Sequence, residues 1–297
     1  MLINQTNLRT LYVGFRTTFQ GAFAAVQPRY GVVAMTVNST TRAEQYGWLD
    51  KFPRMREWIG DRQVMNLSQS DYTIRNRDFE STVGVDRNDI EDDNIGLYAP
   101  IVQEFGRSAA TFPDELVWPL LANGWNSKCY DGQPFFDTDH PVLNEHGREV
   151  SYANTDGGND APWFLIDDTR AIKPVIYQNR RPATFVALDS PDDPNVFMKK
   201  KFLYGNDCRC NVGFSFPQLA WGSKQPLTPA AYKTARQELG GRKGDYGRPL
   251  GIRGTLLVVG SSNEEAARKL LTSDTINGGD SNPWKGTAKL EVVEWLP

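Results

Sequence analysis

The strongest constraint on the fold is a long apolar repeat between residues 97 and 120. Apolar side chains recur there at intervals of four and three residues, which is the period of one face of an α-helix. The positions are Leu97, Ile101, Phe105, Ala109, Phe112, Leu116 and Leu120. A stripe of this length needs one continuous packing partner, so we expect a long helix that lies against the rest of the chain.

The residues around this stripe set its ends and its shape. Four acidic residues between 89 and 93 favour the positive end of a helix dipole, and Gly124 is a suitable stop. Pro113 lacks a backbone N–H, so it should kink the helix or split it in two. The sequence therefore predicts a long, bent helix within residues 87–124.

The segments before the helix have an unusual composition. Residues 1–43 are an arm, in which polar runs flank a short apolar piece that either the rest of the chain or a neighbouring subunit must cover. Residues 44–86 mix aromatic with basic side chains, which suits an interface, and two β-rich pieces in it predict an extended hairpin-like loop. The alternative is an ordinary sheet edge packed on its own core. The aromatic residues are Tyr46, Trp48, Phe52, Trp58, Tyr72 and Phe79.

The chain after residue 125 is typical of a sheet-rich unit. Short strand candidates alternate with Gly, Asn, Asp and Pro turns, and two helices follow residues 228 and 262. The near alternation of residues 288–295 predicts a last strand that pairs back into an earlier domain. The fold class is therefore α+β.

Composition excludes several classes of protein. The formal charge of −3 lacks the basic excess of a dedicated nucleic-acid binder. Three cysteines are too few and odd in number for a disulfide framework. We find no apolar run of roughly 20 residues and no leader pattern at the start, so we expect no membrane contact and a cytoplasm-like compartment.

The best candidate for chemistry is the segment 135–141, in which Asp137, Asp139 and His140 lie close together. A zinc or transition-metal site needs three or four convergent ligands, and only His146 and Cys129 are near in sequence. We therefore interpret the two carboxylates as caps of backbone donors in a tight turn. A metal-assisted hydrolase centred on His140 is the alternative. No Gly-rich phosphate-binding motif is present, and we expect no cofactor.

Two basic clusters have three open interpretations. They could neutralise a few phosphates, pair with acidic residues of a neighbour, or simply be solvated. The residues are Arg180, Arg181, Lys199, Lys200 and Lys201.

Several local motifs, in their order along nearly the whole chain, resemble the Mu-like phage major head subunit family. No single one is diagnostic, but together they are fairly specific. They lie at residues 89–93, 114–124, 130–141 (YDGQPFFDTDHP), 171–178, 213–220 and 282–286.

This resemblance implies an HK97-type capsid fold. Its parts would be an N-terminal arm (1–43), an E-loop (44–86), the spine helix of a peripheral domain (87–124), an axial domain with peripheral-sheet segments (125–280), and a strand returning to the peripheral domain (281–297). Trp48, Phe52, Trp58, Tyr72 and Phe79 would then contact neighbouring subunits.

The resemblance also implies a function without enzymatic activity. Copies of the chain would form hexamers and pentamers of an icosahedral phage head around double-stranded DNA. Scaffold, portal and possibly decoration proteins would be its partners. It would be assembled in the host bacterial cytoplasm and end in the virion. A tail component is the alternative structural role.

Overall fold

The computed structural model describes residues 2–49, 72–276 and 279–297. Six α-helices lie within these ranges: α1 (Gln5–Ala25), α2 (Arg87–Glu91), α3 (Ala99–Ala122), α4 (Pro194–Lys199), α5 (Pro229–Gly240) and α6 (Glu264–Thr272). Five short 3-10 turns accompany them: η1 (Tyr30–Val32), η2 (Asn94–Tyr98), η3 (Pro217–Leu219), η4 (Asp245–Gly247) and η5 (Ser261–Asn263).

The strands build two larger sheets and four two-stranded ribbons. Their bounds are β1 (Ala34–Asn38), β2 (Ala43–Gln45), β3 (Thr73–Arg75), β4 (Arg77–Asp86), β5 (His140–Leu143), β6 (Glu149–Tyr152), β7 (Thr155–Gly158), β8 (Trp163–Ile166), β9 (Val175–Leu188), β10 (Lys201–Phe214), β11 (Ala220–Lys224), β12 (Lys243–Gly244), β13 (Arg248–Pro249), β14 (Leu256–Val259), β15 (Thr275–Ile276), β16 (Asp280–Ser281) and β17 (Lys289–Val292).

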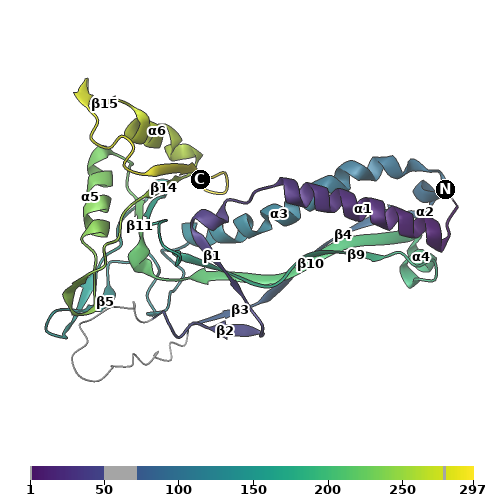
Figure 1. Cartoon of the computed structure of the whole chain (residues 1–297), viewed down its shortest axis with the longest axis horizontal. Coiled ribbons are helices and arrows are strands. Elements are labelled where there is room, and N and C mark those ends of the chain that lie inside the picture. The colour runs from purple at the N-terminus through teal and green to yellow at the C-terminus, as the bar shows by residue number, and fades with distance from the viewer. Residues whose placement is uncertain (1, 50–71, 277–278) are drawn as a thin grey trace.

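The molecule has an elongated part and a more compact part (Figure 1). In the elongated part, α1 and α3 run alongside a four-stranded sheet of order β1-β9-β10-β4. The compact part holds a five-stranded sheet of order β17-β14-β8-β11-β7, with α5 and α6 beside it. This mixture of helices and mostly antiparallel sheets is the expected α+β class.

A hairpin of two 14-residue strands forms the centre of the elongated part. β9 and β10 pair in antiparallel register along most of their length, and β4 continues the ladder on the other side of β10. Alternate residues of the hairpin, such as Phe185 and Phe202, are buried under the helices. Because successive side chains of a strand point to opposite faces, these buried residues form one face of the sheet, which the helices cover.

The helix α1 lies on α3 and covers the same face of the sheet. Its side-chain cap is Asn4, which accepts a hydrogen bond from the backbone N–H of Asn7 at 2.8 Å. Phe15 and Phe19 are buried in one cluster with Phe105 of α3. Of the two alternatives for the apolar side chains of residues 1–43, the structure therefore shows coverage by the same chain.

The long helix occurs where the sequence predicted it, and most of the predicted stripe packs on the apolar clusters. α3 begins at Ala99, contains Pro113 and Pro119, and buries Val102, Val117 and Trp118, among others. The predicted stripe members Leu97 and Ile101 are exposed instead, because Leu97 lies before the helix in η2 and Ile101 is on its exposed side.

The compact part is covered on both faces of its sheet. The strands β8 and β14, with sequences WFLI and LLVV, are buried at every position. One face packs against Tyr232 of α5 and Leu270 of α6, and the other packs against Trp118 of α3. Burial of both faces explains why these strands show continuous apolar runs and no alternation.

The last strand belongs to the five-stranded sheet. β17 pairs in parallel with β14, with Leu290 opposite Leu257. Leu290 packs on the same apolar cluster as Leu257, and this burial explains the choice of partner. The predicted domain boundaries stay predictions, including the return of residues 281–297 to the peripheral domain.

Candidate assembly surfaces

The base of the predicted loop 44–86 is tied to the chain's own core. β2 and β3 pair in antiparallel register, and the Tyr46 hydroxyl donates to Gln178 Oε1 at 2.7 Å. The Trp48 ring lies 5.9 Å from the Phe216 ring. The Tyr72 hydroxyl accepts a hydrogen bond from the backbone N–H of Phe214, and burial raises the pKa of Tyr72 to about 12.

The other aromatic residues predicted to contact neighbours divide into two groups. Phe79 lies on β4 under the helices, with its ring 4.7 Å from the Phe112 ring and 5.2 Å from the Arg77 guanidinium. Phe52 and Trp58 lie outside the described residues. Trp48, Tyr72 and Phe79 therefore have partners inside the chain, which leaves only part of each side chain for a neighbour.

The structure does not bring the two basic clusters together. Arg180 and Arg181 are exposed on β9, and Arg181 forms an ion pair with Asp207. Lys199, Lys200 and Lys201 are exposed where α4 joins β10. Arg181 is opposite Arg209 in the ladder, so the stretch of β10 from Lys201 to Arg209 separates the two clusters. This stretch is about 26 Å long at roughly 3.3 Å per residue.

A set of strongly exposed apolar side chains, which sequence reasoning missed, lies at the far end of the elongated part. We call this set the apolar tip. The helices α2 and α4 and the N-terminus share this end (Figure 1), and the backbone N–H of Arg87 bonds the carbonyl of Lys200 there. Phe197 and Met198 are 84% and 75% exposed. The members are Leu2, Leu97, Phe197 and Met198.

Such exposure is informative, because burial of a single large apolar side chain is worth about 1.5–3 kcal/mol. Exposed apolar side chains that gather in one place mark surfaces that other molecules cover. The sequence does contain a signal for the tip. The pair Phe197-Met198 stands between an acidic run and three lysines, where a solvated loop would be polar.

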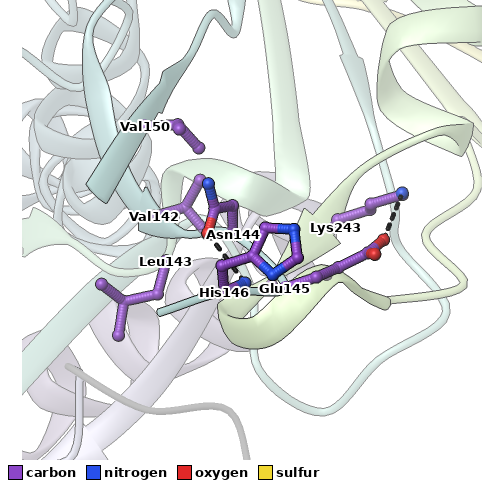
Figure 2. Close-up of a pocket in the computed structure, with 9 residues that line it drawn as sticks. Val142, Leu143, Asn144, Glu145, His146, Val150 and Lys243 are labelled. Carbon is purple, nitrogen blue, oxygen red and sulfur yellow. Dashed lines mark hydrogen bonds and ion pairs between the residues drawn. The ribbon is translucent and has the colours of Figure 1, made fainter. Parts of the chain in front are cut away.

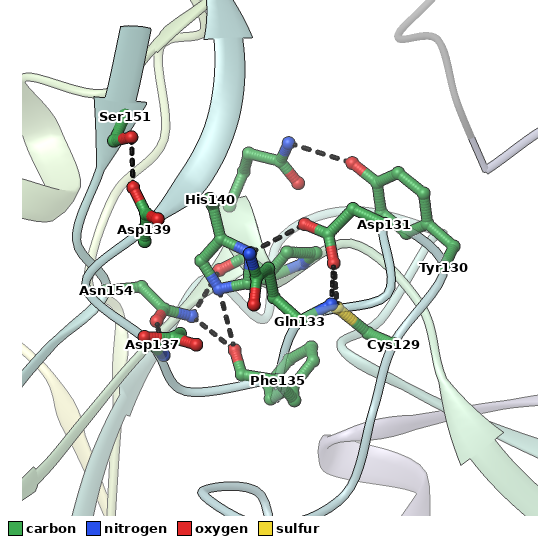
Figure 3. A network of polar contacts seen from close by, with 12 residues as sticks. Cys129, Tyr130, Asp131, Gln133, Phe135, Asp137, Asp139, His140, Ser151 and Asn154 are labelled. Carbon is green, nitrogen blue, oxygen red and sulfur yellow. Dashed lines mark hydrogen bonds and ion pairs between the residues drawn. The ribbon is translucent and has the colours of Figure 1, made fainter.

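A buried polar cluster forms around His140 (Figure 3). His140 Nδ1 lies 2.6 Å from Asp131 Oδ2, and the Cys129 thiol donates to Asp131 Oδ1 at 3.0 Å. All three residues are buried or nearly so. We call them the 129–131–140 cluster.

Electrostatics couple the members of this cluster. Burial by itself would raise the pKa of Asp131, but hydrogen bonds from His140 and Cys129 outweigh it and hold this pKa below its usual range. Burial and the charge of Asp131 raise the pKa of the Cys129 thiol far above its usual value. The cluster has three potential metal ligands, of which Cys129 and His140 both bond Asp131.

The sequence drew attention to His140 but to the wrong carboxylates. Asp137 accepts a hydrogen bond from the backbone N–H of Thr138, which confirms its expected role as a cap. Asp139 bonds the Ser151 hydroxyl instead (Figure 3). Asp131 was not predicted, because its position next to His140 depends on the turn through Gly132, which has a φ of 85°.

The second histidine lies elsewhere, at a surface pocket of about 220 Å³ (Figure 2). His146 is in the turn between β5 and β6, and its backbone N–H bonds Asn144 Oδ1. Glu145 and Lys243 form an exposed ion pair at 3.7 Å beside it. His140 is fully buried, so a substrate has no access to its imidazole in this structure. Among the described residues, no helix is long and apolar enough to cross a bilayer.

Comparisons with known proteins agree along the whole chain. The model of the Mu-like prophage major head subunit gpT family matches residues 8–296. The major capsid protein of Escherichia phage Mu is 41% identical over 305 aligned residues, which cover 100% of both chains.

Solved structures give the same result at the level of the fold. The chain matches a protein in the procapsid of bacteriophage JBD30 with a TM-score of 0.88 and 41% identity, covering 99% of this chain and 100% of that one. It also matches a chain of the JBD30 capsid decorated with minor capsid protein trimers, with a TM-score of 0.77 and 32% identity. That match covers 92% of this chain and 93% of the other.

Proposed function

Since the chain belongs to the family of Mu-like prophage major head subunits, we propose that its copies form the hexamers and pentamers of an icosahedral head around double-stranded DNA. The chain is a major capsid protein with an HK97-like fold, so it is a subunit of a shell in the virion. The family match concerns a head subunit and not a tail component. The observation that carries the proposal is similarity to capsid chains over essentially the full length.

Electron microscopy of the purified protein, alone and with its scaffold, tests this proposal. We expect closed shells in which rings of five and six subunits can be resolved. Protein that stays monomeric under all assembly conditions, scaffold included, would overturn the proposal, and tubes would favour a tail role.

We propose two surfaces for contact between subunits. The first is the loop 44–86, in which Trp48, Phe52 and Trp58 would bury apolar area on an adjacent subunit. Tyr72 and Phe79 would support this surface from the core side, where they already pack. The second is the apolar tip, which supplies exposed area at the other end of α3.

Substitution of Trp58 by alanine tests the loop contact. We expect fewer shells with unchanged circular dichroism of the unassembled subunit. Tyr246→Ala is a matched control, since Tyr246 is an exposed aromatic residue in the compact part. Equal shell yields for the two variants would contradict the loop contact.

We propose that contacts to DNA are local and weak, because the chain carries a net charge of −3. Arg180, Arg181, Lys199, Lys200 and Lys201 are the candidates, either for packaged DNA or for a neighbouring subunit. DNA binding by unassembled protein that falls steeply with salt, and falls further in a Lys199→Ala, Lys201→Ala double variant, would favour DNA. An effect on shell yield alone would favour the neighbour.

Partner proteins and the place of assembly complete the proposal. Scaffold and portal proteins would guide assembly in the host bacterial cytoplasm. Decoration is supported by the JBD30 capsid, which carries minor capsid protein trimers. Co-purification of these phage proteins with the shells is the measurement, and shells of normal size formed without any of them would contradict it.

A further inference from the structure

We propose that the 129–131–140 cluster binds one zinc ion, or a similar divalent transition-metal cation, as a structural site of the capsid subunit. The three side chains offer a thiolate sulfur, a carboxylate oxygen and an imidazole nitrogen, which are the ligand types that zinc prefers. One ligand atom from each lies within 4.8 Å of the other two. The inference is independent of how the subunits assemble.

The local backbone holds two of the ligands in place. Residues 129–133 form a tight turn, in which the N–H of Cys129 bonds the carbonyl of Gln133 at 2.8 Å. Asp131 Oδ1 accepts a second bond from the backbone N–H of Gln133 at 3.0 Å. The turn therefore presents the Cys129 and Asp131 side chains on the same side, toward the first residue of β5 (Figure 3).

The orientation of His140 is the second observation that indicates a ligand. Its Nε2 lies 3.2 Å from the carbonyl oxygen of Phe135, which can only accept a hydrogen bond. Histidines that bind metals usually donate the other ring N–H to a carbonyl or carboxylate in this way. A neutral His140 that donates from Nε2 has its lone pair on Nδ1, which points at Asp131 (Figure 3).

A cation is therefore needed between Nδ1 and the carboxylate, and it is either a proton or a metal. Binding of a divalent ion displaces the protons that the ligand atoms carry, because zinc binds a thiolate and a neutral imidazole. The Asp131 charge that disfavours a free thiolate favours a thiolate bound to a dication.

Metal binding requires the ligand atoms to move from their present positions, in which they lie within 4.8 Å of one another. Ligand bonds of about 2.0 Å in a tetrahedral site place Nδ1 and the carboxylate oxygen roughly 3.3 Å apart, and they are 2.6 Å apart with a hydrogen bond between them. Gln218 is attached to the same turn: its Oε1 is buried without a hydrogen-bond partner, and its Nε2 bonds the hydroxyl of Tyr130, the residue between Cys129 and Asp131 in the sequence. The complete burial of His140 fits a closed structural site and not a catalytic one.

Metal content and cobalt substitution test this inference on the unassembled subunit. We expect about one zinc per chain after growth with zinc and dialysis, and a thiolate-to-cobalt charge-transfer band in the near ultraviolet after exchange with Co²⁺. Cys129→Ser, which keeps a donor to Asp131, should lose this band and bind metal at least tenfold more weakly. Cys208→Ser removes a buried thiol outside the cluster and should keep both properties.

The wild-type protein alone can also overturn the inference, so it survives a variant that does not fold. Absence of stoichiometric metal together with absence of the cobalt band would refute it. A chelator should lower the melting temperature of wild type and Cys208→Ser but not of Cys129→Ser. An equal response of Cys129→Ser and wild type would also refute it, whether or not the protein forms shells.

Discussion

At the scale of single residues, Gly106 shows how closely the chain can approach itself. A Cβ atom at this position would lie 2.4 Å from the backbone oxygen of Phe19 and 3.0 Å from the Cβ of Ala22. Glycine thus allows α1 and α3 to meet backbone to backbone. The apolar cluster of the elongated part depends on this contact, because α1 covers it.

Gly106→Ala should therefore push α1 away from α3 and lower the free energy of unfolding by about 1–3 kcal/mol. Chemical denaturation of the purified subunit measures this change. Gly14→Ala is the matched control in α1, since nothing lies within 4 Å of its new Cβ, and it should raise stability by up to about 1 kcal/mol. Equal stabilities of the two variants would show that the helices do not meet at Gly106.

Asp168 gives a pH-dependent prediction at the same scale. Its burial would raise its pKa, but the Thr255 hydroxyl and Lys289 of β17 outweigh burial and lower the pKa of Asp168. A folded-state pKa below the unfolded value of about 3.9 means that the carboxylate stabilises the fold above that pH. This stabilisation is lost as pH falls through the lowered pKa.

Melting curves of wild type and Asp168→Asn between pH 3 and pH 7 check this sign. We expect the variant to melt at a lower temperature near neutral pH, with the gap closing below about pH 4. Asp274→Asn breaks the exposed ion pair with Lys285 and should change the melting temperature much less. A gap that widens toward acid pH would contradict the assigned role of Asp168.

Residue-level reasoning from sequence found His140 but not its partners. Spacing in sequence favoured Asp137 and Asp139, whereas the φ of 85° at Gly132 is what brings Asp131 to the imidazole. A positive φ changes the direction of the chain, and no spacing rule predicts where the chain then leads. The exposed tip was missed for a related reason, since exposure is a property of the folded surface.

At the scale of elements, α1 differs most from expectation. From the sequence we expected residues 1–43 to form an arm with little core of its own. About half of these residues instead form the 21-residue helix α1. Phe15 is buried with its ring 5.1 Å from that of Tyr204, at right angles. α1 therefore provides much of the apolar cover of the β9–β10 hairpin.

Removal of the Phe15 ring tests how much α1 contributes. Phe15→Ala should cost about 3–5 kcal/mol of unfolding free energy, as expected for a buried aromatic side chain. Val13→Ala, on the exposed side of the same helix, should change stability by less than about 0.5 kcal/mol. A small effect of Phe15→Ala would mean that α1 is held by other contacts.

The elements could be predicted only as far as local periodicity reaches. The apolar stripe gave a long helix at α3, although Leu97 lies before it in η2 and Ile101 is on its exposed side. Strand candidates such as residues 163–166 were found, but their partners were not. Pairing of β17 with β14 is a contact between distant segments, and alternation in a strand does not identify its partner.

At the scale of the whole molecule, the fold exposes apolar side chains at the apolar tip, and this exposure does not stabilise an isolated subunit. Phe197 and Met198 lie at the end of a hairpin that extends away from the compact part (Figure 1). The overall architecture was predicted from the resemblance of several motifs to a capsid family. Composition and periodicity alone gave only an α+β protein with an interface-like segment.

The double substitution Phe197→Ser, Met198→Ser tests whether the apolar tip acts in assembly. We expect shell yield to fall at least severalfold, because each lost apolar contact weakens every repeated interface. The melting temperature of the unassembled subunit should stay within about 2 °C of wild type. Val150→Ser, at an exposed position of β6, is the control, and shells formed equally well by both variants would exclude the tip as a contact.

The junction of the two parts has a consequence for synthesis on the ribosome. The Arg29 guanidinium bonds the carbonyl of Val292 at 2.7 Å, across 263 residues of sequence. Val293 and Leu296 are buried in the same cluster as Val33 and Val117. Translation delivers the N-terminal segments first, so a nascent chain can form the α1–α3 pair early but cannot close this junction until residues 289–296 have emerged. A polypeptide that ends before residue 289 lacks these C-terminal side chains, so it cannot form the contacts that join the two parts.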